Sequence, residues 1–252
     1  METWQAADSA NIDALVLRAD TEVVRLFAAA TGNSDRNPAH DTLPRDQLDR
    51  ALRICLRAAD LAGPDPMPWV SLLTLSRLYG GGHQDSNVWW QALQARDPYN
   101  REAHHQVLRH LSARWHGSHG SMYDFAHDRA SGAPDGSPLV VLLQAARAEH
   151  FRHHWESEVR GQGPGQPWRW DDGIHYELRF TMNKWIRQRR ATAQDVADLN
   201  ILVHALVRAG WLVAAREVFT VLGNRPTRAP WEYTGDPLAD FTRWRNKLIG
   251  KI

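Results

Sequence analysis

The sequence contains one cysteine, three lysines and no long apolar run, and each scarcity limits what the protein can be. Its single thiol, Cys55, excludes both a disulfide within the chain and a zinc site built from several cysteines. No window approaches the ~18 apolar residues that a membrane-spanning helix needs. The first residues also lack the basic region and apolar stretch of a secretory signal, so we expect a cytoplasmic protein.

Motifs for common chemistry are missing as well. Neither of the phosphate-binding patterns GxxxxGK[ST] and GxGxxG occurs. Ser118 is flanked by glycines, but His116 replaces the first glycine of a nucleophile elbow, and helices replace the strand that the elbow needs. A net charge of +1 gives no strong field toward nucleic acid or anionic lipid. We therefore expect no catalytic centre and no cofactor.

Helical periodicity is the main feature that the sequence does have. Between Asp46 and Leu61, one helical stripe carries Leu48, Leu52, Cys55, Leu56 and Ala59. This pattern predicts a buried, inert thiol. The segment His175 to Phe180 alternates like a strand, but two aspartates before it are suitable helix N-caps, so we predict a helix through about Gln188.

A repeat of about 35 residues organises the middle of the chain. A shift of 35 residues aligns Trp69, Leu72, Leu73 and Ser76 with His104, Val107, Leu108 and Leu111, and a second shift reaches Leu139, Leu142, Leu143 and Ala146. The same shift carries Trp90 onto Phe125, which predicts equivalent buried sites for these two rings. Twelve tryptophans are spread along the chain, and we expect their large rings to pack between successive hairpins and bury apolar area there.

A further helical pair is predicted near the C-terminus. Leu199, Leu202 and Leu206 share a face, Gly210 makes the turn, and Ala215 and Phe219 lie on the returning helix. This pair resembles the tetratricopeptide repeat, whose period is ~34 residues and whose small and aromatic residues let the two helices approach closely. The resemblance implies an all-α fold of tetratricopeptide-like stacked helical hairpins, an α-solenoid.

Two segments, around Arg114–Ser118 with Phe125 and around Pro230–Tyr233 with Gly235, are also similar to a group of bacterial helical-repeat proteins to which no activity is attached. The predicted organisation is one helical-repeat domain over 1–252. It consists of irregular N-terminal helices over 1–62, repeats over about 66–155, a Gly/Pro loop over 161–172 and C-terminal helices over 173–252.

The repeat register also predicts a concave groove, because the first helix of each hairpin lines that surface in a solenoid. The groove-facing positions are Arg77, His105, Arg109, Arg147, Asn200, His204 and Arg208. Arginines suit an acidic segment or a terminal carboxylate. We therefore expect a non-catalytic protein- or peptide-binding scaffold. The lysine and asparagine with which tetratricopeptide proteins clamp a peptide carboxylate are not reproduced.

Two alternatives remain open. His150, His154 and Glu158 stand four residues apart on one helix face, so they form a weak candidate metal site for a metal-dependent enzyme; solvated or capping histidines explain them more simply. The basic run 184–190 concentrates four positive charges around Trp185, which suits a nucleic-acid-binding regulator. More often, such a run is the solvated face and C-terminal end of a helix, where cations complement the helix dipole.

Overall fold

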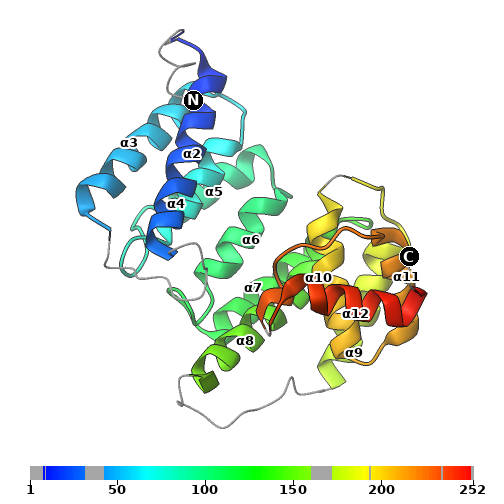
Figure 1. The fold of residues 1–252 in the computed structure, drawn as a ribbon. Helices are drawn as coiled ribbons and strands as arrows, with labels where there is room; N and C mark the ends of the chain where they lie inside the picture. The colour runs from blue at the N-terminus through cyan, green and yellow to red at the C-terminus, as the bar shows by residue number, and fades with distance from the viewer. Residues whose placement is uncertain are drawn as a thin grey trace. The chain divides into compact units, whose positions relative to one another are not determined.

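The computed structural model describes residues 8, 10–31, 43–159, 172–192, 194–233 and 235–250, without the side chains of residues 31, 157–159 and 172. Within these ranges every regular element is helical and no strand occurs, which confirms the all-α prediction (Figure 1). The chain divides into two compact units, Met1–Ser118 and His119–Ile252, which are described separately. Among the described residues, no helix combines the length and the apolar character needed to cross a membrane.

The first unit is built around a central short helix. Its helices are α2 (Ile12–Thr31), α3 (Arg45–Leu61), α4 (Met67–Ser76), α5 (Ser86–Arg96) and α6 (Arg101–His110). Helix α4 packs against α2, α3, α5 and α6, and α2 also packs along α3. This central place explains why α4 is apolar on nearly all sides, whereas α3 has a clear polar face.

The predicted stripe on α3 forms with one exception. Leu48, Cys55 and Ala59 are buried, but Leu56 lies at the edge of the stripe and is exposed. Burial raises the pKa of Cys55 to about 12, with smaller contributions from Asp20 and Glu22. The thiol is therefore protonated and inert, as the periodicity predicts.

Helices α4 and α5 form the first predicted hairpin, but the position of its buried ring differs from the prediction. Trp89 is only 3% exposed, whereas Trp90 is partly buried and meets His104 edge to face. The corresponding ring, Phe125, is also only partly buried. The prediction of equivalent buried sites for Trp90 and Phe125 is therefore wrong, because the helix turns the preceding residue, Trp89, toward the core.

The second unit contains six α-helices within the described ranges. They are α7 (His119–Gly132), α8 (Leu142–Val159), α9 (Asp172–Thr181), α10 (Asp195–Arg208), α11 (Leu212–Leu222) and α12 (Pro237–Ile249). Three short turns of 3₁₀ or π type accompany them: η1 (Pro138–Val141), η2 (Met182–Ile186) and η3 (Trp231–Tyr233). Helix α7 packs along α8, and α8 contacts α9 and α10.

The C-terminal hairpin of α10 and α11 forms as predicted. Gly210 takes a left-handed conformation with φ of 69°, which reverses the chain in a tight turn. Ala215 and Phe219 on the returning helix are fully buried, together with Leu202 and Leu206 on α10. The small side chain of Ala215 permits close packing of the two helices, which contact each other along the hairpin.

The segment from residue 172 to residue 186 is helical, which confirms the helical interpretation of His175 to Phe180. Its last turn, η2, is a π-turn that buries Trp185 completely. Gly136 approaches this turn closely: its N–H donates to the carbonyl of Lys184 at 2.7 Å, and a Cβ there would lie 2.9 Å from the carbonyl oxygen of Gln188. The predicted Gly/Pro loop over 161–172 falls almost wholly outside the described residues.

Candidate functional site

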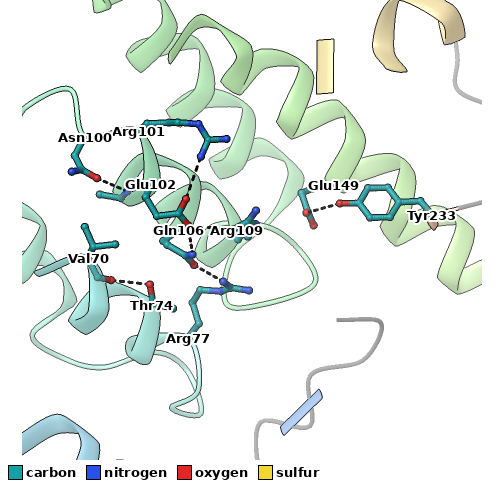
Figure 2. Close-up of polar contacts among 11 residues, drawn as sticks. Val70, Thr74, Arg77, Asn100, Arg101, Glu102, Gln106, Arg109, Glu149 and Tyr233 are labelled. Carbon is teal, nitrogen blue, oxygen red and sulfur yellow. Dashed lines mark hydrogen bonds and ion pairs between the residues drawn. The ribbon is translucent and has the colours of Figure 1, made fainter. Parts of the chain in front are cut away.

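Three predicted groove residues of the first unit belong to a polar network inside it. Arg77 is buried and donates to Gln106 Oε1 at 2.6 Å (Figure 2). Its guanidinium carbon also lies 3.9 Å from the ring centroid of Trp115. His105 is buried too, whereas Arg109 is partly exposed. The guanidinium of Arg77 is thus held between an amide and an aromatic face, and it does not line open surface.

The network continues through Glu102, the acidic residue at the start of α6. Its carboxylate accepts a hydrogen bond from Gln106 Nε2 at 2.7 Å and lies 3.9 Å from Arg109 (Figure 2). Burial opposes ionisation of Glu102, but Arg109 and the neighbouring donors outweigh it, so the pKa of Glu102 is lowered. The arginines here neutralise an acid of their own unit.

Three other groove candidates lie on α10 in the second unit. Asn200 and His204 are fully buried. The side chain of Asn200 accepts from Trp231 Nε1 at 2.9 Å and donates to the carbonyl of Arg225 at 3.0 Å. Arg208 is partly exposed and lies 3.5 Å from Asp240 on α12. These polar groups therefore fasten the C-terminal segment onto α10.

The remaining candidate, Arg147 on α8, is engaged by Glu177 on α9. Arg147 Nη2 donates to Glu177 Oε1 at 3.0 Å and Nε donates to Oε2 at 2.5 Å, with both side chains largely buried. A two-point pair of this kind uses two of the five N–H donors of a guanidinium and holds its plane against the carboxylate.

The predicted groove needs correction on these observations. Arg77, His105, Asn200 and His204 are buried, so a ligand does not reach them in this structure. The physical reason is that polar positions on the first helices pair with partners supplied later in the chain. Arg109 and Arg147 belong to different units, so their predicted place in one concave groove stays a prediction.

The basic run 184–190 is divided between internal bonds and open surface. Lys184 donates to the carbonyl of Ser131 at 2.9 Å, and Arg189 forms an ion pair with Asp195 at 2.5 Å. Trp185 is buried. Arg187 and Arg190 are exposed. Two of the four cations, Lys184 and Arg189, therefore bind groups of the second unit itself, and two remain exposed.

An open hollow of about 610 Å³ adjoins this run. Its lining comes from the end of α9, from η2 and from the first turns of α11, and it consists of Arg179, Met182, Asn183, Arg187, Gly210, Trp211, Leu212, Val213, Ala214 and Glu217. Val213 is 88% exposed, and Arg179 and Arg187 are exposed cations. A second hollow of about 450 Å³ shares Arg179 and Asn183 with the first.

The second unit also gathers three histidines. His119 is the first residue of α7, and His150 and His154 lie one turn apart on α8. One ring nitrogen from each lies within 4.8 Å of the others. The rings of His119 and His150 stack with their centroids 3.7 Å apart. The Nε2 atoms of His150 and His154 are 2.9 Å apart.

Burial and mutual repulsion govern the charge of this cluster. The pKa of His150 is lowered to about 4, mainly by burial and to a smaller extent by His119, His154, His153 and Arg147. The pKa of His119 is lowered for the same reasons, burial first. A neutral imidazole is the form that binds a metal ion.

The histidine cluster differs from the predicted candidate in one member. His150 and His154 come together as the helical spacing predicts. The side chain of the third candidate, Glu158, lies outside the described residues. His119 takes part although its sequence position gave no sign of it, since 31 residues and a helical hairpin separate it from His150. Only the packing of α7 on α8 brings it there.

No protein-family model matches this chain, and comparisons with curated proteins and with solved structures give no match either.

Proposed function

We propose that the chain is a non-catalytic binding module of the tetratricopeptide type, which holds an acidic peptide segment of another protein in the hollow beside η2 and α11. The observation that carries this proposal is that two exposed arginines, Arg179 and Arg187, line one open hollow of the second unit together with apolar residues. The α10–α11 hairpin, with Ala215 and Phe219 buried at its centre, supports the repeat class.

The lining suits a peptide with one apolar side chain beside carboxylates. Met182, Leu212 and Val213 offer apolar surface, and removal of such surface from water favours association. Exposed guanidinium groups bind carboxylates by paired, charge-assisted hydrogen bonds. Glu217, which also lines the hollow, disfavours an acid next to α11, so the carboxylates of the ligand belong on the side of Arg179 and Arg187.

This proposal keeps the predicted binding of an acidic peptide, but it places the peptide in the hollow beside η2 and α11 instead of the predicted groove. The predicted groove residues are largely buried, whereas the lining of this hollow has Val213, Arg179 and Arg187 in contact with solvent. The shift brings in Arg187 from the basic run, which was predicted as an alternative surface. Its neighbours Lys184 and Arg189 already have partners in the protein, which favours a local peptide site over a phosphate-binding track.

Selection from a random displayed peptide library tests the proposal. The full chain should enrich peptides in which aspartate or glutamate stands next to a leucine, a phenylalanine or a similar apolar residue. A synthetic peptide of the enriched sequence should bind with an affinity that falls as salt rises, because exposed charge pairs are screened.

The double variant Arg179→Glu/Arg187→Glu should lose binding at least about tenfold, which corresponds to ~1.4 kcal/mol. The matched control is Arg53→Glu/Arg57→Glu on the exposed face of α3, which changes the net charge equally. Enrichment of peptides without acids, or equal loss in both variants, would contradict the proposal.

A further inference from the structure

The histidine cluster of the second unit has the composition of a metal site. His119, His150 and His154 each offer one ring nitrogen, and these nitrogens lie within 4.8 Å of one another. The three residues come from two helices that pack side by side, α7 and α8 (Figure 1). Three ligands on a rigid hairpin are a common basis for a protein metal centre.

One buried ring nitrogen of the cluster makes no hydrogen bond to any described residue. Nδ1 of His119 is buried and has no hydrogen-bond partner among the described residues. Buried polar atoms are nearly always paired, so an exception points to a ligand or ion that supplies the partner. This observation is independent of the spacing of the three rings.

A second group orients the cluster from outside. The hydroxyl of Tyr123, one turn along α7 from His119, lies 3.0 Å from Nδ1 of His150. A metal-binding imidazole usually donates its other N–H to an oxygen of this kind, which fixes the ring and its tautomer. With Nδ1 of His150 facing Tyr123, Nε2 is the atom that faces His154, at 2.9 Å. Tyr123 is therefore a positioning residue.

We propose that His119, His150 and His154 bind one divalent transition-metal ion of the zinc class. Among the described residues the cluster consists of three imidazole nitrogens, which suit Zn²⁺, Ni²⁺ or Cu²⁺, whereas Mg²⁺ and Ca²⁺ require oxygen ligands. Three protein ligands leave a fourth position for water or for a donor atom of a bound molecule. This inference does not depend on the peptide-binding proposal.

Binding requires a small rearrangement of the rings. Two nitrogens at 2.0–2.1 Å from one tetrahedral zinc ion are about 3.3 Å apart. The nitrogens of His150 and His154, at 2.9 Å, must therefore separate slightly, and the stacked rings of His119 and His150 must turn until their lone pairs converge. His154 is exposed and His119 is the first residue of its helix, so the rearrangement involves one exposed side chain and one at a helix end.

Titration of the metal-free full chain without a polyhistidine tag tests the site. Zn²⁺ added in competition with a chromophoric chelator should bind at one equivalent with a micromolar or lower Kd. Co²⁺ should bind at the same site and give the visible absorption of a four- or five-coordinate nitrogen environment. Absence of stoichiometric binding of both ions would overturn the proposal.

Single variants assign the ligands. His119→Ala, His150→Ala and His154→Ala should each weaken Zn²⁺ binding more than about 100-fold, beyond the 10–100-fold that loss of an outer partner causes. Tyr123→Phe should fall within that lower range and should shift the Co²⁺ spectrum. His127→Ala, an exposed histidine on α7 outside the cluster, is the matched control and should bind normally. Far-ultraviolet circular dichroism establishes that each variant is folded.

One outcome separates this site from an adventitious one. The pair His150 and His154 alone, at helical spacing i and i+4, binds Zn²⁺ or Cu²⁺ weakly on any exposed helix. Binding that survives His119→Ala unchanged but is lost in His154→Ala would show such a two-histidine surface, and the three-histidine site would be rejected.

Discussion

Arg147 and Glu177 form a two-point ion pair that joins α8 to α9, with N–O distances of 2.5 and 3.0 Å and both side chains largely out of solvent. Arg147→Ala would leave the buried carboxylate of Glu177 without its main partner. Loss of one member of a buried pair typically costs ~3–5 kcal/mol. We expect urea denaturation to show a loss of this size.

The double variant Arg147→Met/Glu177→Leu is the control for this prediction. Replacement of both charges by apolar groups of similar volume removes the desolvation cost of both, so the double variant should be more stable than Arg147→Ala. If Arg147→Ala unfolds at the same urea concentration as the wild type, the pair contributes nothing, and Arg147 would be available to a ligand after all.

The corrected repeat register makes a second prediction. Trp89, and not Trp90, fills the core of the first unit. Trp89→Ala should therefore lower the free energy of unfolding by ~3–5 kcal/mol, the usual cost of deleting a large buried aromatic side chain. Trp90→Ala should cost clearly less, because its ring is only partly buried against His104. Thermal melting of both variants compares them; an equal or reversed order would restore the predicted register.

Acid stability gives a third prediction through His204. The pKa of His204 is lowered to about 3, mainly by burial and to a smaller extent by Arg208. The unfolded chain takes up a proton near pH 6.5, whereas the folded chain does so only near pH 3. The contribution of His204 to the free energy of unfolding is therefore fully present above pH 6.5 and is lost progressively as the pH falls toward 3.

Between pH 7 and pH 5, this one group should cost about 2 kcal/mol of unfolding free energy. His204→Leu replaces the imidazole beside Trp231 by an apolar side chain of similar size and removes the titratable group. Urea denaturation at both pH values should thus show a shallower acid loss in the variant. Parallel pH dependence of the two proteins would mean that His204 is protonated in the folded state.

The sequence predicts the local parts of this structure well. Periodicity gives the helices, and the spacing of Gly210, Ala215 and Phe219 gives the C-terminal hairpin, because neighbouring residues determine these features. Trp89 and Trp90 show the limit of such patterns: one residue corresponds to about 100° around a helix, so a small error in register exchanges a core position for a surface one.

The site was harder to predict because its geometry depends on distant residues. The sequence pattern predicts Arg77 as a groove residue, but its guanidinium donates to Gln106, which lies 29 positions later in the chain. Asn200 is similarly held by Trp231, 31 positions later. His119 joins His150 only through the packing of two helices. Polar residues with such partners cannot be told from free ones in a sequence.

Photo-crosslinking from the lining of the hollow is the most direct test of the peptide-binding proposal. p-Benzoylphenylalanine placed at Val213, an exposed residue of the lining, should crosslink an acidic peptide selected against the full chain, and unlabelled peptide should compete. The same group at Val24, which is also exposed but lies on α2 of the first unit, should not crosslink that peptide. Crosslinking at Val24 and none at Val213 would contradict the proposed site.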